Sequence, residues 1–223
     1  MAINLKRGNY TYKVPFERIA VYAAEVLSKY ENPSEVKALD FGFGGGRHLK
    51  LLKDLGYDVY GIDVTEDALD TTYYNLGENF IPRERLTIGN ILEQPIYPEE
   101  SFDVVLSVGV IWSLGYKKMI EFLDKIVPIL KKDGYLIANF RTKFDDIYLA
   151  ANPGGKGEKK EAYVPELNKF YAFLDIDELR DLMEHYGLSI ERLERYDWYS
   201  NRGGYDSYYK EGNSYWCTIL RKK

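Results

Sequence analysis

The chain has 223 residues, of which 45% are hydrophobic and 29% are charged, as in an ordinary soluble protein that folds into one compact domain. These values exclude a disordered or fibrous chain. The formal net charge of -5 gives no general attraction to a polyanion, so we expect no nucleic acid partner.

The sequence also argues against a signal peptide, a membrane span, a disulfide and a metal site. The N-terminal stretch has no apolar core typical of a signal peptide, and no segment offers about 18 uninterrupted apolar residues for a membrane span. We therefore predict a cytoplasmic protein with no membrane partner. Cys217 is the single cysteine and His48 and His185 are the two histidines, so we expect no disulfide and no metal site.

The first predicted elements form a βαβ unit behind a covering helix. Pro15–Tyr30 carries apolar residues at helical spacing and predicts an amphipathic helix. Val36–Phe41 is a short apolar run that predicts a buried parallel strand. A helix over Arg47–Leu55 and a strand over Val59–Ile62 follow it, separated by Gly56.

The same alternation continues through the middle of the chain. Thr65 is placed to cap a helix that runs through Tyr73, and apolar residues at spacings of three and four predict another helix over Met119–Leu130. Apolar runs predict three more strands, at Leu86–Ile88, Phe102–Val108 and Tyr135–Phe140.

The alternation stops at Arg141–Phe170, which is rich in Gly, Lys and Glu and holds two prolines, so we predict an insertion or mobile lid there. A helix over Ile176–Tyr186 and strands over Leu188–Trp198 and Tyr215–Leu220 complete the chain.

Strands that alternate with helices predict an α/β, doubly wound fold, with helices on both faces of a mainly parallel seven-stranded sheet and an antiparallel last strand. We expect a single domain over residues 1–223. Its parts are an N-terminal helical cap (1–33), a ligand-binding core (34–140), a lid or insertion (141–172) and a C-terminal helix with strands (173–223).

The most informative segment is the glycine-rich loop that follows the first strand. Glycine is required where the backbone turns sharply and approaches a ligand closely. The start of the next helix adds unpaired N–H groups suited to a carboxylate or phosphate. The dinucleotide fingerprint G-x-G-x-x-G/A fails here, because reading from Gly42 puts Arg47 last and reading from Gly44 puts Leu49 last.

The loop instead reads D-x-G-x-G-x-G, formed by Asp40, Gly42, Gly44 and Gly46, and it resembles the class I S-adenosylmethionine-dependent methyltransferases, which have a Rossmann-like fold. The resemblance covers residues 36 to 140. It implies S-adenosyl-L-methionine as cofactor and S-adenosyl-L-homocysteine as product. It places Asp63 on the ribose hydroxyls and Val64 on the adenine. The implied cofactor-binding residues are Asp40, Gly42, Phe43, Gly44, Gly46, Asp63, Val64, Asn90, Ile91, Ser107 and Val108. Asn90 stands where the family usually has Asp.

The methyl acceptor is expected beyond the carboxyl ends of the strands, where open α/β sheets bind ligands. The candidate residues there are aromatic or cationic, namely Tyr10, Tyr12, Arg18, Trp112, Arg141, Tyr199, Arg202 and Tyr205. Aromatic rings would favour a cationic acceptor, and the arginines an anionic one. No residue stands out as a general base, and His48 is assigned to packing or to the surface beside the cofactor.

The predicted activity is O- or N-methylation of a small molecule by a monomer or homodimer. SVGVIW stands after the fourth strand, where nucleic acid amino-methyltransferases carry [DN]-P-P-[YFW]. Three alternatives remain open: a nicotinamide-dependent oxidoreductase, a non-catalytic homologue that keeps the cofactor, and methylation of protein side chains.

Overall fold

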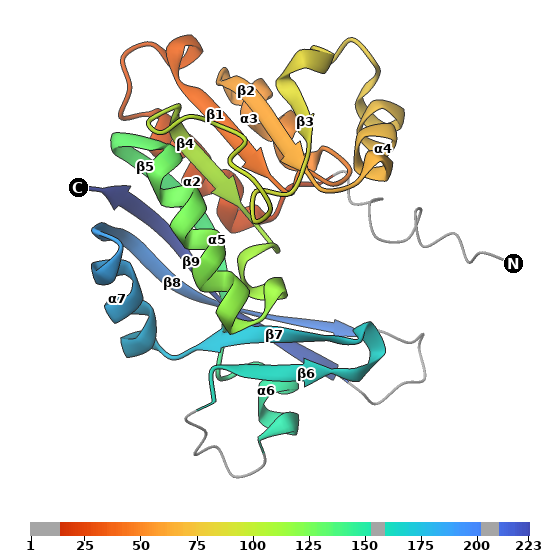
Figure 1. Ribbon diagram of the computed structural model, residues 1–223, viewed down its shortest axis with the longest axis vertical. Helices are drawn as coiled ribbons and strands as arrows, with labels where there is room; N and C mark the ends of the chain where they lie inside the picture. Colours follow the sequence, from red (N-terminus) through yellow and green to blue (C-terminus); the bar gives the residue numbers. More distant parts are fainter. Residues whose placement is uncertain (1–13, 153–158, 202–209) are drawn as a thin grey trace, which may run out of the picture.

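A computed structural model describes residues 14–152, 159–201 and 210–223 of the chain. Its first half is an alternation of strands and helices (Figure 1). The elements are α2 (Glu17–Leu27), η1 (Pro33–Glu35), β1 (Lys37–Phe41), α3 (Arg47–Leu55), β2 (Asp58–Asp63), α4 (Glu66–Leu76), η2 (Arg83–Arg85), β3 (Leu86–Ile88) and β4 (Phe102–Ser107). Thr65 caps α4 as predicted, because its side chain accepts a hydrogen bond from the Ala68 N–H.

The second half adds two strands and one short α-helix that the sequence pattern did not predict. Its elements are η3 (Ile111–Leu114), α5 (Tyr116–Ile129), β5 (Leu130–Thr142), α6 (Asp146–Ala151), β6 (Glu161–Val164), η4 (Pro165–Leu167), β7 (Lys169–Leu174), α7 (Ile176–His185), β8 (Leu188–Asn201) and β9 (Lys210–Lys222). β6 and β7 pair as an antiparallel hairpin inside the segment predicted as a lid or insertion.

The sheet of the described residues has nine strands, in place of the predicted seven. Strands β3, β2, β1, β4 and β5 pair in parallel in that order. β9 runs antiparallel to β5 and pairs β8 on its other side, which confirms the predicted antiparallel last strand. These are the seven predicted strands.

The β6–β7 hairpin extends the sheet beyond the end of β4. Arg141 of β5 pairs Tyr215 of β9 on one edge and Phe173 of β7 on the other. β4 pairs β5 only as far as Ala138, so β7 takes the free edge that β5 offers past that point. Figure 1 shows the hairpin and α6 below the main sheet.

Helices cover both faces of the sheet, as the doubly wound class requires. One apolar layer joins α2, α3 and α4 to one face, and the other joins α5 and α7 to the opposite face. Neighbouring strand residues alternate between the two layers, as Val104 and Val105 do in β4. Because β1, β2, β4 and β5 pair in parallel, their carboxyl ends lie at the same edge of the sheet.

Candidate cofactor and acceptor sites

The glycine loop between β1 and α3 adopts a conformation that favours glycine. Gly42, Gly44 and Gly46 have φ of 78°, 51° and 81°, in the left-handed region. A Cβ on Gly42 would overlap Val110 Cγ2. The loop is tied back to β2, because the Gly42 N–H donates to the Ile62 carbonyl at 2.8 Å. The backbone angles and this bond fix the shape of the loop at the carboxyl end of β1.

Asp63 ends β2 beside this loop and holds its shape. Its Oδ2 accepts a hydrogen bond from the Gly44 N–H at 2.9 Å, and its Oδ1 accepts one from the Val64 N–H at 2.7 Å. Asp63 is 8% exposed, and its Oδ1 also accepts bonds from the Thr65 N–H at 3.2 Å and the Thr65 hydroxyl at 3.4 Å. Among the described residues Oδ2 accepts only the Gly44 N–H bond, so this oxygen has capacity left for a hydroxyl group of a ligand.

Two side chains of α4, which the sequence analysis missed, hold the loop from the other side. The Thr72 hydroxyl donates to the Gly44 carbonyl at 3.0 Å, and the Asn75 amide donates to the Gly45 carbonyl at 2.9 Å. The two residues lie three positions apart and so share one face of the helix. Their polar character on the face of α4 directed at the core was the available signal.

Asp40 is a buried acid beneath the loop. Burial raises the pKa of Asp40 to about 7, Arg47 opposes this rise, and the neighbouring Asp63 carboxylate adds to it. Its Oδ2 has no hydrogen-bond partner among the described residues. The Ser107 hydroxyl at the end of β4 is likewise buried and without a described partner. Such orphaned polar atoms are suited to a bound polar ligand.

The residues expected beside the adenine lie after β2 and β3. Val64 is 60% exposed, so its side chain offers an apolar surface at the open edge. Asn90 is partly buried, its amide donates to Glu93 at 2.9 Å, and its Oδ1 accepts from the Leu92 N–H at 3.1 Å. Ile91 and Phe43 are buried.

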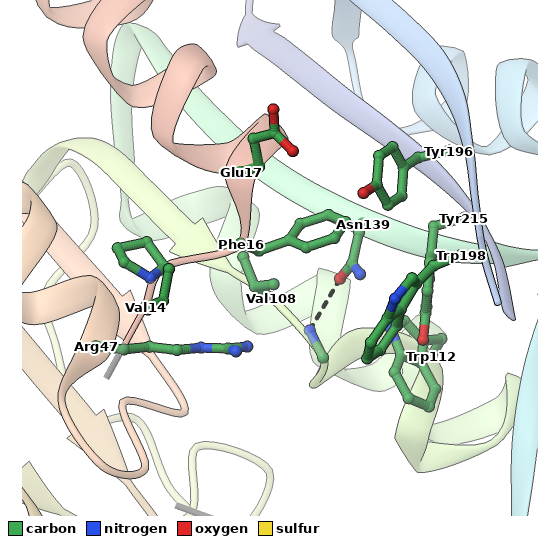
Figure 2. A pocket seen from close by; sticks show the side chains of 12 residues that line it. Val14, Phe16, Glu17, Arg47, Val108, Trp112, Asn139, Tyr196, Trp198 and Tyr215 are labelled. Carbon is green, nitrogen blue, oxygen red and sulfur yellow. Dashed lines mark hydrogen bonds between the residues drawn. The ribbon is translucent and has the colours of Figure 1, made fainter. Parts of the chain in front are cut away.

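A cavity of about 470 Å³ opens next to the glycine loop, at the carboxyl ends of β4 and β5 (Figure 2). Asn139 of β5 accepts a hydrogen bond from the Gly109 N–H at 2.8 Å and so holds the turn after β4. The lining is largely aromatic and apolar, with three polar exceptions. It consists of Val14, Pro15, Phe16, Glu17, Arg47, Val108, Gly109, Trp112, Asn139, Tyr196, Trp198 and Tyr215.

Few of the predicted acceptor residues line this cavity. Trp112 does, as does the predicted cofactor residue Val108. Arg18 points elsewhere, since its guanidinium pairs Glu194 at 3.4 Å and it is absent from the lining. Only the backbone of Tyr199 is described, as part of β8. Four further candidates lie outside the described residues, namely Tyr10, Tyr12, Arg202 and Tyr205.

Arg141 lies behind the aromatic wall of the cavity. Its side chain is 6% exposed and pairs Asp145 at 2.7 Å. Its guanidinium carbon lies 4.4 Å from the ring centre of Trp112, 5.0 Å from that of Tyr171 and 5.3 Å from that of Tyr215. The predicted contact of Arg141 with an anionic acceptor is therefore replaced by an ion pair inside an aromatic cage.

His48 serves packing, as the sequence analysis assigned it. Its ring is buried, and its Nε2 accepts a hydrogen bond from the Phe16 N–H at 3.3 Å. Burial lowers the pKa of His48 to about 3, and the charge of Arg47 acts in the same direction. The neutral ring thus anchors the segment that contributes Val14, Pro15 and Phe16 to the cavity wall.

The sequence analysis missed most of the cavity wall. Phe16, Tyr196, Trp198 and Tyr215 all line it, and Arg47 enters it from the opposite side (Figure 2). The concentration of tyrosines between residues 196 and 215 was a signal, but it did not say which rings face inward.

Within the described residues, no three His, Cys, Asp or Glu side chains are grouped as metal ligands would be. No helix in the described ranges has the length and apolar character of a membrane span.

Comparison with known proteins agrees with the family resemblance that the glycine loop indicated. Residues 39–138 match the family model described as "Methyltransferase domain". An uncharacterized protein of Methanocaldococcus jannaschii is 32% identical over 129 residues, which cover 58% of this chain and 49% of that protein. The chain thus spans about half the length of this relative.

Two further proteins are similar over more of the chain. A ubiquinone biosynthesis O-methyltransferase of Rickettsia bellii is 26% identical over 178 residues, covering 79% of this chain and 71% of that protein. The solved structure of the 1,6-didemethyltoxoflavin-N1-methyltransferase of Burkholderia thailandensis, with bound S-adenosylhomocysteine, has a TM-score of 0.63 at 18% identity, covering 93% of this chain and 79% of that one.

Proposed function

We propose that this chain, which belongs to the class I S-adenosylmethionine-dependent methyltransferases, transfers the methyl group of that cofactor to an oxygen or nitrogen of a small molecule. The observation that carries the proposal is the glycine loop, in which Gly42, Gly44 and Gly46 have backbone angles that favour glycine and which is hydrogen-bonded to Asp63. Asp63 keeps acceptor capacity on its Oδ2, and Asp40 beneath the loop has an oxygen without a described partner. These groups fit an amino acid joined to a nucleoside.

The proposed arrangement assigns each group a separate task. Asp63 would accept hydrogen bonds from the ribose hydroxyls, and Val64 would cover one face of the adenine. Asp40 and the main chain of the loop would hold the methionine end, near Ser107 and Val108. Asn90 and Ile91 would border the adenine edge. Thr72 and Asn75 would keep the loop in the required shape.

When bound, the cofactor supplies a methyl group on a sulfonium, which the acceptor atom takes by in-line displacement while the electron pair of the broken C–S bond stays on sulfur. The protein's part is to align the acceptor atom with the methyl carbon and to exclude water. The cavity beside Val108 and Gly109 is placed for this task. Its volume of about 470 Å³ suits a small molecule, and the net charge of -5 argues against nucleic acid.

Ligand binding tests the proposal. S-adenosylhomocysteine at a hundred times its dissociation constant should stabilise the folded state by about 2.7 kcal/mol and raise the melting temperature, whereas NAD should not. Stabilisation by NAD alone would instead indicate an oxidoreductase. If the cofactor binds but a broad screen of small acceptors shows no methyl transfer, the non-catalytic alternative gains.

A further inference from the structure

The walls of the cavity narrow the class of acceptor. Resting on the proposed function, we infer that the acceptor is a planar, electron-rich aromatic ring that carries a hydroxyl group, and that this oxygen receives the methyl group. Phe16 reaches the cavity from the segment before α2, Trp112 from η3, and the remaining aromatic rings come from β8 and β9, namely Tyr196, Trp198 and Tyr215. Flat aromatic side chains from separate elements are suited to stacking against a planar ring.

An aromatic wall can also bind a cation, but here a cation of the protein already lies against it. The Arg141 guanidinium carbon lies 4.4 Å from the ring centre of Trp112 and 5.3 Å from that of Tyr215, and both rings line the cavity. A guanidinium against a ring draws its π electrons toward itself. The ring then attracts a second cation less strongly and an electron-rich ring more strongly. An acceptor with an ammonium group is therefore disfavoured.

The buried position of Arg141 makes this polarisation a fixed property of the wall. Asp145 pairs the guanidinium at 2.7 Å and is itself fully buried, where it also accepts a hydrogen bond from the Ser214 N–H at 3.0 Å. The Tyr215 hydroxyl lies 3.3 Å from Arg141 Nη2. The ion pair therefore links the end of β5 to β9 and keeps the Tyr215 ring at the cavity.

One of the two charged groups in the described lining, Arg47, favours an oxygen that becomes negative. Arg47 extends into the cavity from the glycine loop, opposite the Trp112 and Trp198 rings (Figure 2). The other charged group of the described lining is Glu17, which is exposed in the first turn of α2. A phenolic hydroxyl that loses its proton to solvent is stabilised by the nearby guanidinium. Its oxygen then forms the new O–CH₃ bond, and the electron pair of the broken C–S bond stays on sulfur.

Base catalysis by histidine plays no part in this scheme. His48 is buried, and its Nε2 is engaged by the Phe16 N–H at 3.3 Å. The described cavity lining holds no lysine and no histidine. An aliphatic alcohol, such as a sugar hydroxyl, needs a strong base because it is far less acidic than a phenol. Glu17 is the one carboxylate of the described lining and is a weak base, so the acidity of the acceptor itself carries the deprotonation.

Three small probes of similar size separate these classes. Saturation-transfer NMR on the full chain with saturating S-adenosylhomocysteine would give dissociation constants for catechol, cyclohexane-1,2-diol and tetramethylammonium. We expect catechol to bind roughly tenfold more tightly than either of the others, the scale of one good aromatic pair. Equal or tighter binding of the diol or of tetramethylammonium would overturn the inference.

A pair of variants tests the role of the wall. Trp198 lines the cavity at 45% exposure, whereas Tyr163 on β6 has the same exposure and lies outside it. Trp198→Leu keeps an apolar side chain and should remove most of the preference for catechol, while Tyr163→Leu should leave it unchanged. An unchanged preference in Trp198→Leu contradicts stacking on this wall.

The two proposals fail in different ways. Calorimetric titration of the same samples with S-adenosylhomocysteine reports on the cofactor site alone. Absence of that binding would refute the proposed function. Normal cofactor binding without discrimination among the three probes would refute only the inference about the acceptor.

Discussion

At the scale of single residues, Asp63 has two tasks where the sequence motif indicated one. Its carboxylate accepts hydrogen bonds from the Gly44 and Val64 N–H groups in addition to the proposed bonds to a ribose. Removal of this side chain would therefore loosen the glycine loop as well as deprive the cofactor of a partner. The loop and the ribose are coupled through one acid.

We predict that Asp63→Ala weakens the binding of S-adenosylhomocysteine by about 1.5 to 3 kcal/mol, the scale for losing hydrogen bonds to a charged group. Calorimetric titration would measure the change. Asp58→Ala is the matched control, because Asp58 begins the same strand and pairs Arg85 away from the loop. A dissociation constant that is the same in both variants would contradict the proposed place of the ribose.

We expect the free energy of unfolding to fall as the pH rises, because the buried Asp40 carboxyl must then lose its proton. Because burial raises its pKa from 3.8 in the unfolded chain to about 7, its contribution to stability is fully present below pH 4 and is lost as the pH rises through 7. We predict that Asp40→Asn is more stable than the natural chain at pH 8, by on the order of 2 kcal/mol, and shows no gain at pH 4. Urea unfolding at the two pH values would measure this.

The same substitution should weaken the cofactor site. Asp40→Asn removes the negative charge next to the proposed methionine end, so the affinity for S-adenosylhomocysteine should fall roughly tenfold. A variant that is stabilised at pH 8 and binds the cofactor as well as the natural chain would show that Asp40 has no part in binding.

At the scale of elements, the glycine loop combines a backbone requirement with a steric one. Gly42 has φ of 78° and no room for a Cβ, whereas Gly187 has φ of 65° and no neighbouring atom within 4 Å of the position that a Cβ would take. Both positions disfavour other residues by their backbone angle. Only Gly42 adds a close contact, which is with the β-branched and therefore stiff Val110 side chain.

We predict that Gly42→Ala lowers the free energy of unfolding by about 1 to 2 kcal/mol more than Gly187→Ala does. Thermal or urea unfolding of the two variants would measure the difference, which reports mainly on the contact with Val110 because both glycines have a φ in the left-handed region. Equal losses would mean that Val110 moves aside freely.

The β6–β7 hairpin shows how an element can escape prediction. Its flanks are rich in Gly, Lys and Glu, which are typical of loops, and each of its strands is short. The hairpin forms because β5 runs past the end of β4 and leaves an edge that β7 can pair, at Arg141 and Thr142. This edge depends on strand lengths in another part of the chain.

At the scale of the whole molecule, we propose that the chain is a single domain. The two apolar layers lie on opposite faces of one sheet, and residues of the same strands, such as Leu39 and Ala38 of β1, belong to different layers. Loss of either layer exposes the strands that support the other one. The layers should therefore unfold together.

We predict a single unfolding transition in urea with the same midpoint by far-ultraviolet circular dichroism and by tryptophan fluorescence. The dichroism reports on all helices, whereas Trp112, Trp198 and Trp216 report on the second half of the chain. Two separate midpoints would contradict a single domain. They would indicate that the C-terminal strands unfold independently of the core.

The sequence by itself determined the order of seven of the strands and of the helices between them, the antiparallel last strand and the position of the glycine loop beside Asp63. These features depend on hydrophobic periodicity and on backbone requirements of neighbouring residues, which can be read locally. Only the tertiary structure decided that Arg141 pairs Asp145 behind the cavity, and that Phe16, Trp112 and Tyr215 share one wall. The charge or aromatic character of a side chain can be read locally. Its partners cannot, because residues such as Phe16 and Tyr215 lie 199 residues apart along the chain and meet only when the strands and helices pack.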